Sequence, residues 1–170
     1  RKVPEGAGKR EKEPDCLSMS KQTTCAFTGH RDITEEIDIN FFTQIMQGFI
    51  DDGYDTFLNG MARGFDLLAA KVILQLKKTN PSLKLIACIP CPEQDRYYNA
   101  SEKLEYASIL EQCDERVYVS QNFYKGCMQK RDRYLVDNCS LLVAYQRKNS
   151  GGAYYTVNYA LSKNVKVCVI

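Results

Sequence analysis

The sequence predicts an α/β protein with a doubly wound, mainly parallel sheet of about six strands and helices on both faces. From Thr23 onward, short β-rich runs alternate with longer stretches of helical periodicity, as expected for a parallel sheet covered by helices. Several short runs are almost entirely apolar, which strands buried on both faces require. A chain of 170 residues supports one ordinary core. We therefore expect a single Rossmann-like domain over residues 22–170.

The elements alternate regularly along the chain. Apolar or β-branched segments of strand length bounded by turn residues predict strands. They occur at 24–28, 55–59, 83–89, 116–120, 141–145 and 165–170. Between them, an apolar side chain recurs every three or four residues, which predicts amphipathic helices. These stripes run over 37–49, 65–76, 106–113, 124–137 and 153–161.

Composition limits the classes of protein. Residues 1–21 mix charged residues with Gly and Pro and offer little to bury, so we expect a flexible tail. The net charge of +2 does not by itself predict nucleic-acid binding. No apolar run approaches the roughly 18–20 residues that cross a bilayer, so no membrane partner is expected. Cys25, Cys88 and Cys168 lie in apolar runs, which favours buried free thiols and a cytoplasmic location.

Three glycine-containing loops follow predicted strands, at the sheet edge where such folds bind ligands. They are Thr28-Gly29-His30-Arg31, Asn59 to Asp66, and Ser150-Gly151-Gly152-Ala153. Glycine permits positive φ and lets a phosphate approach the backbone without meeting a Cβ. A single glycine is more often a turn residue, but three such loops on one edge favour a phosphate site. The candidate ligand-binding residues are Gly29, His30, Arg31, Gly60, Met61, Ala62, Arg63, Gly64, Asp66, Arg131, Gly151, Gly152 and Ala153.

Two polar candidates, His30 and Asp66, each leave alternatives open. His30, the only histidine, either contacts a phosphate or base or is a helix-capping or loop residue hydrogen-bonded to the backbone. Without a second histidine or a convincing carboxylate pair, no metal site is expected. Asp66 lies outside the apolar stripe of its helix, so we expect it to face away from the core. There its negative charge interacts favourably with the positive end of the helix dipole, or its oxygens accept hydrogen bonds from a ribose.

Arg131 lies on a helical face with apolar neighbours three or four residues away. An unpaired buried charge is costly, so its guanidinium should meet a protein carboxylate or an anionic ligand. Alternatively, its stem packs against apolar side chains while the charged head reaches water.

The loop motifs occur together as Cys25-Ala-Phe-Thr-Gly-His-Arg, Gly60-Met-Ala-Arg-Gly-Phe-Asp, and Asp137-Asn-Cys-Ser-Leu-Leu-Val-Ala-Tyr before Gly151-Gly152. Over residues 23–170, this pattern resembles the YpsA-like branch of the SLOG superfamily, which includes the DNA-processing protein A domain and the LOG phosphoribohydrolases. The resemblance implies a Rossmann-like fold that binds or senses nucleotides or nucleotide-derived ligands.

The DNA-processing branch implies one alternative function. Gly60 to Asp66 resembles its Gly-x-Ala-x-Gly-Ile-Asp motif, and Arg131-Asp-Arg133 resembles its Arg-Asn-Arg. This likeness implies binding of single-stranded nucleic acid, with stacking on tyrosines. The side chains available for it are Lys125, Lys130, Arg131 and Arg133, with Tyr124 or Tyr134.

The LOG branch implies another alternative, N-glycoside hydrolysis of a nucleoside monophosphate. Arg131 matches the arginine of that family, and Gly151-Gly152 match its glycine pair, but Asn158 stands where the family has a catalytic Glu. An amide cannot act as that carboxylate, so LOG-type hydrolysis is disfavoured. A hydrolase would need another acid, with Asp66 or Asp132 as candidates.

The leading hypothesis is therefore binding or sensing of a phosphate-bearing nucleotide or a nucleotide-derived ligand such as ADP-ribose. No cofactor is assigned with certainty, and whether the chain is an enzyme stays open. The many tyrosines would suit the contacts of a homodimer.

Overall fold

The structure, a computed structural model, describes residues 19–170. Within this part, six strands form one sheet in the order β4-β3-β2-β1-β5-β6. This order confirms the predicted doubly wound fold. The sheet was predicted to be mainly parallel, and every pairing in it is parallel. The strands are β1 (Thr24–Gly29), β2 (Thr56–Asn59), β3 (Lys84–Ile89), β4 (Glu115–Tyr118), β5 (Leu141–Tyr145) and β6 (Lys166–Val169).

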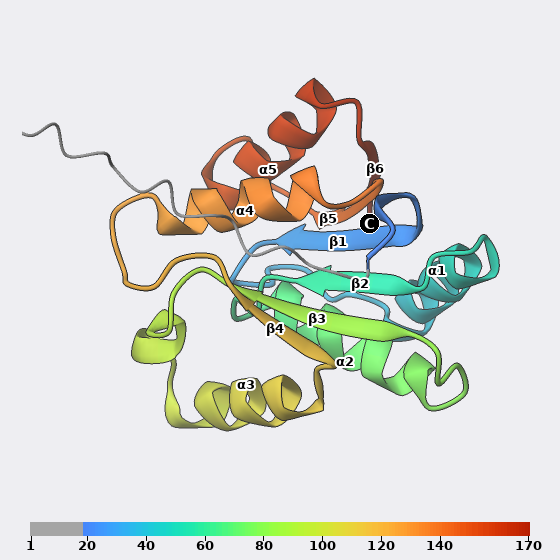
Figure 1. Cartoon of the computed structure of the whole chain (residues 1–170), viewed down its shortest axis with the longest axis horizontal. Coiled ribbons are helices and arrows are strands. Elements are labelled where there is room, and N and C mark those ends of the chain that lie inside the picture. Colours follow the sequence, from blue (N-terminus) through green and yellow to red (C-terminus); the bar gives the residue numbers. More distant parts are fainter. Residues whose placement is uncertain (1–18) are drawn as a thin grey trace, which may run out of the picture.

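Five α-helices in the described part cover the two faces of this sheet. In Figure 1, α4 and α5 lie on one side of the strands, with α2 and α3 on the other. Successive strand residues divide between two cores: Phe27 and Phe57 pack in one, Ala26 and Leu58 in the other. The helices are α1 (Ile39–Asp51), α2 (Phe65–Lys77), α3 (Ala100–Gln112), α4 (Cys127–Asp137) and α5 (Gly151–Ser162).

Local capping sets where the helices begin. The first helix, expected from residue 37, begins at Ile39 because the Asp38 side chain accepts a hydrogen bond from Phe41 N. The fourth, expected from residue 124, begins at Cys127 because Gly126 precedes it in a left-handed conformation, with φ of +103°. Helix α3 begins with a capping box between Asn99 and Glu102.

The strand order opens a crevice beside the central strand. The chain winds outward from β1 to β4 through α1, α2 and α3, and then returns through α4 to β5 on the other side of β1. The connections that leave β1 and β5 therefore diverge to opposite faces of the sheet. Ligands of doubly wound proteins bind at this switch point, beyond the carboxyl ends of the strands.

The beginning of the described chain belongs to the domain. Of the predicted tail, residues 1–18 lie outside the described residues. Met19 packs against the core beneath α4 and α5, and a short 3₁₀ helix, η1 (Lys21–Thr23), leads into β1. The described cysteines are free thiols, and Cys25 and Cys88 are buried as expected, whereas Cys168 is only half-buried because β6 lies at the edge of the sheet. Among residues 19–170, none of the helices has the length and apolar character to cross a bilayer.

Candidate functional site

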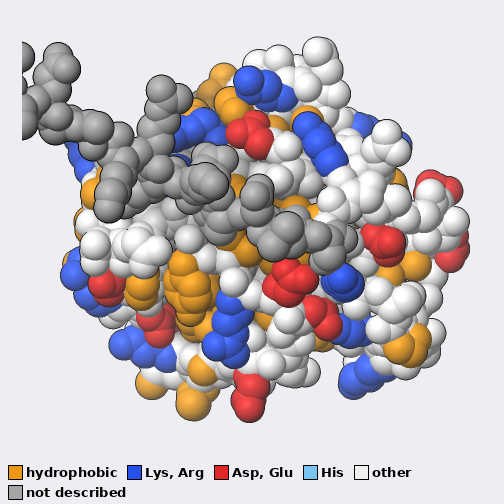
Figure 2. All heavy atoms as spheres, in the orientation of Figure 1, with side chains coloured by type: hydrophobic (Ala, Val, Ile, Leu, Met, Phe, Trp, Pro, Cys, Tyr) orange, Lys and Arg blue, Asp and Glu red, His pale blue; other side chains and the backbone are white. Residues whose placement is uncertain are grey.

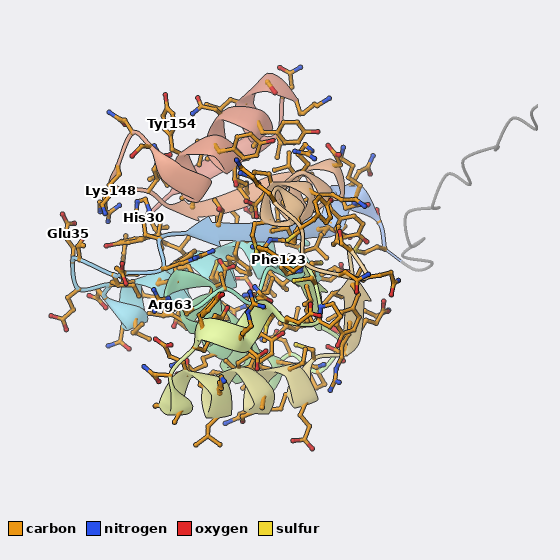
Figure 3. The ribbon with its side chains drawn as sticks, turned by 90° about the vertical axis from the view of Figure 1, so that its left-hand side faces the viewer. His30, Glu35, Arg63, Phe123, Lys148 and Tyr154 are labelled. Atoms are coloured by element: carbon orange, nitrogen blue, oxygen red, sulfur yellow. The ribbon has the colours of Figure 1, made fainter. Side chains whose placement is uncertain are left out.

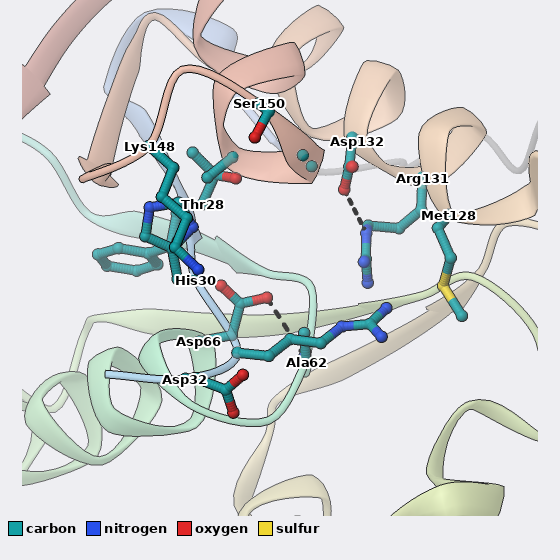
Figure 4. A pocket seen from close by; sticks show the side chains of 16 residues that line it. Thr28, His30, Asp32, Ala62, Asp66, Met128, Arg131, Asp132, Lys148 and Ser150 are labelled. Atoms are coloured by element: carbon teal, nitrogen blue, oxygen red, sulfur yellow. Dashed lines mark hydrogen bonds and ion pairs between the residues drawn. The ribbon is translucent and has the colours of Figure 1, made fainter. Parts of the chain in front are cut away.

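A cavity of about 380 Å³ lies at the carboxyl ends of β1 and β5, within the roughly 300–1,000 Å³ typical of small-molecule sites. Its walls come from the loop after β1, the first turns of α2 and α5, helix α4 and the loop after β5 (Figure 4). The lining residues are Phe27, Thr28, Gly29, His30, Arg31, Asp32, Ala62, Asp66, Met128, Arg131, Asp132, Lys148, Ser150, Gly151, Gly152 and Ala153.

Most of the predicted site residues meet in this cavity. Four do not line it: Gly60, Met61, Arg63 and Gly64. These four belong to the loop between β2 and α2, and each has a contact within the protein that accounts for its position. The residues that line the cavity as predicted are Gly29, His30, Arg31, Ala62, Asp66, Arg131, Gly151, Gly152 and Ala153.

The loop between β2 and α2 supports the cavity from behind. Met61 is fully buried, its N–H donates to Asn59 Oδ1 at 2.8 Å, and its carbonyl accepts from Tyr98 Oη at 3.0 Å. Gly64 has a φ of +83°, and a Cβ there would collide with the carbonyl of Arg31. Arg63 pairs with Glu102 at 3.8 Å. These contacts make the loop a rigid support.

The glycines differ in what surrounds them. A Cβ on Gly29 would collide with the Phe65 side chain, and a Cβ on Gly60 would lie 2.8 Å from Arg131 Nη1. Both glycines are therefore explained by close packing inside the protein. Gly151 and Gly152 instead have nothing within 4 Å of an added Cβ although both line the cavity. The backbone of α5 is thus the part of the wall that stands open to a ligand.

The N-terminus of α5 has no side-chain cap. Ser150 occupies the capping position without a side-chain hydrogen bond, and the first turn contains no acidic residue. The first amides of a helix lack intrahelical acceptors and lie at the positive end of its dipole, so they attract anions. Because Ser150, Gly151, Gly152 and Ala153 all line the cavity, this helix end forms one of its walls.

Asp66 was expected to face away from the core, and it lines the cavity, where it is nevertheless buried, with 5% of its surface exposed. The first turn of α2 lies under the crevice, and the carboxyl group points into the cavity (Figure 4). Oδ2 accepts a hydrogen bond from Ala62 N at 3.2 Å, whereas Oδ1 has no partner among residues 19–170. Burial raises the pKa of Asp66 to about 7, although the charge of Arg131 acts in the opposite direction.

Arg131 forms the opposite wall, with 5% of its surface exposed. Its Nε donates to Asp132 Oδ1 at 2.8 Å, and its Nη1 donates to the carbonyl of Gly60. Of the two expected partners, the protein carboxylate is observed, contact with an anionic ligand stays a prediction, and the alternative with the charged head in water was wrong. Burial disfavours the charge, but Asp132 and then Asp66 outweigh that effect and raise the pKa of Arg131. A fixed positive charge therefore lies at the cavity wall.

His30 joins the loops that follow β1 and β5. Its Nε2 accepts a hydrogen bond from Arg147 N at 2.7 Å, so the backbone alternative is observed, while ligand contact stays a prediction. Partial burial and then the charges of Lys148 and Arg147 lower the pKa of His30, which favours its neutral form. In Figure 3, His30 and Lys148 lie next to each other, and both line the cavity.

Three further lining residues were not among those predicted: Asp32, Met128 and Lys148. Their positions carried a signal, because each lies within three residues of a predicted one. Lys148 shares the loop before Ser150, and Met128 lies one helical turn before Arg131. Within the described chain, no cluster of three or more His, Cys, Asp or Glu side chains could hold a metal.

The high pKa of Asp66 predicts a pH-dependent stability. The pKa of Asp66 is about 7 in the folded protein and about 4 in the unfolded chain. Between these two pH values, the carboxyl group is therefore protonated in the folded protein and ionised in the unfolded chain. Stability therefore falls as pH rises through this window. Asp66→Asn has no such titration, so it should gain roughly 2–3 kcal/mol relative to wild type between pH 5 and pH 8.

Urea unfolding of both proteins at several pH values measures this difference. All other titrating groups are the same in the two proteins, so their contributions cancel in the difference between the unfolding free energies. A difference that stays constant with pH would contradict a protonated Asp66 in the folded protein.

The fold and this cavity define a Rossmann-like α/β protein with a candidate anion site at the switch point of its sheet. A family model named YpsA, described as the YspA SLOG family, matches residues 25–167. The chain belongs to this family, which confirms the resemblance found in its loop motifs.

Two bacterial relatives illustrate the family. The uncharacterized SPbeta prophage-derived protein YoqJ of Bacillus subtilis is 31% identical over 116 residues, which cover 61% of this chain and 68% of YoqJ. The UPF0398 protein BH1768 of Halalkalibacterium halodurans is 33% identical over 122 residues, covering 70% of this chain and 65% of that protein. The chain thus spans about two thirds of the length of these relatives.

Among solved structures, the chain is similar to DNA processing protein A of Helicobacter pylori, with a TM-score of 0.63 at 16% identity. The match covers 86% of this chain and 64% of that one. That structure concerns the single-stranded DNA binding mode of the Helicobacter protein. At this level of identity, the likeness shows a shared fold.

Proposed function

We propose that the protein binds a nucleotide or a nucleotide-derived ligand through its phosphate and ribose. One observation carries the proposal: at the switch point of the sheet, one cavity is lined by both the uncapped N-terminus of α5 and the buried Asp66 carboxyl with its unpartnered Oδ1. The helix end suits an anion, and the carboxyl group suits a hydroxyl. A sugar phosphate carries both groups.

The phosphate binds against Gly151, Gly152 and Ala153. Their amides form the first turn of α5, and the lack of a Cβ on the two glycines lets phosphate oxygens approach the backbone. Arg31 and Lys148 are exposed and line the same cavity. Their side chains extend over the site and balance the negative charge.

The ribose binds beside Asp66. An acceptor that is buried without a donor costs about 1–3 kcal/mol, and a ribose hydroxyl that donates to Oδ1 would offset this cost. Such a hydrogen bond favours the ionised carboxylate, so ligand binding should lower the pKa of Asp66 from its value near 7. Asp66 therefore contributes selectivity for a hydroxyl-bearing ligand.

Binding of small phosphate compounds tests this function. AMP, ADP-ribose and ribose 5-phosphate should each raise the melting temperature, by roughly 5–10 °C at a hundredfold excess over Kd. Adenosine, which lacks the phosphate, should bind far more weakly. Thermal shift and calorimetric titration measure these differences. A cooperative melting transition that none of the phosphate compounds moves at millimolar concentration would reject the proposal.

A hydrolase remains the second candidate because Asp66, with a pKa near 7, has the value that suits a general acid or base. Asn158, at the position of the family's Glu, lies outside the cavity, and its Nδ2 donates to Tyr154 O at 2.8 Å. Chemistry would therefore depend on Asp66 or Asp132, which both line the cavity. Release of free base from nucleoside monophosphates, lost in Asp66→Asn, would identify a hydrolase.

Binding of single-stranded nucleic acid through the basic and tyrosine side chains between residues 124 and 134 has mixed support. Arg131 and Tyr134 are 5% and 6% exposed, so they cannot offer a charge and a stacking surface to a polymer, whereas Lys125 and Tyr124 are exposed. On the visible part of the face in Figure 2, acidic and basic side chains are interspersed. Salt-dependent binding of an oligonucleotide would support this alternative instead.

Two further expectations remain proposals. The free thiols of the described chain support a reducing compartment, and we place the protein in the cytoplasm on that basis. A homodimer would use exposed tyrosines such as Tyr97 and Tyr154. Light scattering of the purified protein measures its oligomeric state.

A further inference from the structure

A second, smaller hollow adjoins the candidate site. It has a volume of about 110 Å³ and shares Arg31, Ala62 and Met128 with the main cavity. Gln94 and Tyr97 form its remaining walls together with Arg63 and Tyr98. Its volume lies below the roughly 300 Å³ of whole small-molecule sites, so it suits one part of a ligand whose remainder occupies the main cavity.

Gln94, which lines the hollow, carries a buried hydrogen-bond acceptor without a partner in the described chain. The side chain is 7% exposed, and its Nε2 donates to the carbonyl of Gly60 at 2.8 Å. Because that carbonyl can only accept, the contact fixes which end of the amide is nitrogen. Oε1 then has no donor within residues 19–170. An unpaired buried acceptor costs about 1–3 kcal/mol, which a ligand N–H would offset.

The same carbonyl links the hollow to the main cavity. Gly60 O accepts from Gln94 Nε2 and also from Arg131 Nη1. Arg131 lines the main cavity and Gln94 lines the hollow. The two recognition sites are therefore held in a fixed relation by one backbone atom.

Tyr97 offers an aromatic surface at the rim. It is 81% exposed, and the Arg96 guanidinium lies 4.7 Å from its ring centre while Nη2 donates to its hydroxyl at 2.9 Å. Tyr98, by contrast, uses its hydroxyl within the protein, donating to Met61 O and accepting from Arg63 N. Tyr97 is thus the ring available to stack on a planar group.

From these contacts we infer that the hollow is a nucleobase subsite that selects bases carrying an exocyclic amine. The amine donates to Gln94 Oε1, the ring stacks on Tyr97, and the attached ribose phosphate occupies the main cavity. The inference rests on the proposed function, because the phosphate and ribose must bind there for the base to reach the hollow.

Two nucleotides and one sugar phosphate test the subsite. AMP and purine riboside 5′-monophosphate differ only in the exocyclic amine, and ribose 5-phosphate lacks the base. Wild type should bind AMP about tenfold more tightly than the purine compound, and both more tightly than ribose 5-phosphate. Gln94→Leu should bring the first ratio close to one while ribose 5-phosphate binds as before.

A second variant tests the subsite independently, in case the Gln94→Leu protein does not fold. Tyr97 is exposed, so Tyr97→Ala should fold normally and weaken AMP and the purine compound alike by about tenfold, leaving ribose 5-phosphate unchanged. Phe41→Ala removes an exposed ring from α1 that lines neither hollow and should change nothing.

The outcomes separate the two proposals. Equal wild-type affinity for AMP and the purine compound, or Tyr97→Ala binding AMP like wild type, would overturn the base subsite while ribose 5-phosphate still binds. If ribose 5-phosphate and AMP both fail to bind, the proposed function fails and the subsite with it.

Discussion

Arg131→Ala is expected to lower the free energy of unfolding by about 3–5 kcal/mol. The guanidinium lies buried between Asp132, Asp66 and the carbonyls of Gly60 and Cys88. Truncation would leave Asp132 without its ion-pair partner and would remove hydrogen bonds from two buried carbonyls. Even Arg131→Lys should recover only part of the loss, since an ammonium cannot make the same set of bonds.

Urea unfolding followed by circular dichroism measures this loss, with Arg133→Ala as the matched control. Arg133 lies two residues along the same helix but is only half-buried, and its contact is a hydrogen bond to Tyr155 Oη at 3.0 Å. We expect its truncation to cost less than about 1 kcal/mol. If the two substitutions lower the free energy of unfolding equally, the buried contacts of Arg131 stabilise the protein no more than the half-buried contact of Arg133.

Arg131 is a poor position at which to test ligand contact. If its truncation unfolds a large part of the protein, a loss of ligand binding in that variant says nothing about ligand contact. Substitutions at open positions of the cavity wall, above all Gly152, separate binding from folding.

The fold followed from the sequence because its strands and helices carry their own patterns. Segments such as 141–145, buried on both faces, have the composition of a central parallel strand, and the stripe over 65–76 fits α2. The edges of elements were less certain because they depend on caps such as Gly126, whose left-handed backbone the apolar periodicity does not show.

The cavity brings together nine of the residues predicted from the sequence, but the sequence did not show what each of them contacts. Glycine after a strand marks close approach of the backbone, but sequence does not show to what: Gly29 approaches Phe65, whereas Gly152 faces open space. Asp66 was expected to face away from the core because the apolar stripe excludes it; the stripe does not show that the crevice lies on that side and buries it. Gln94 lies in a loop without periodicity, so nothing local indicated its contact with Gly60.

Gly152→Asp is expected to abolish binding of AMP and ribose 5-phosphate without harming the fold. A Cβ at this position meets nothing within 4 Å, and an acidic residue in the first turn of a helix is favourable by about 0.3–1 kcal/mol. The new carboxylate would occupy the place of the phosphate. Two like charges about 4 Å apart repel by about 4 kcal/mol at an effective dielectric constant of 20, so affinity should fall at least 100-fold.

Two controls make the result specific. Gly152→Ala fills part of the same space without charge and should weaken binding less, because the helix amides keep their field. Gly48→Asp adds the same charge on α1, where a Cβ also meets nothing within 4 Å, and should leave binding unchanged. Calorimetric titration gives the affinities, and thermal melting without ligand shows whether each variant is folded. A folded Gly152→Asp protein that binds ribose 5-phosphate like wild type would mean that the phosphate lies elsewhere, because a carboxylate and a phosphate cannot share the first turn of α5.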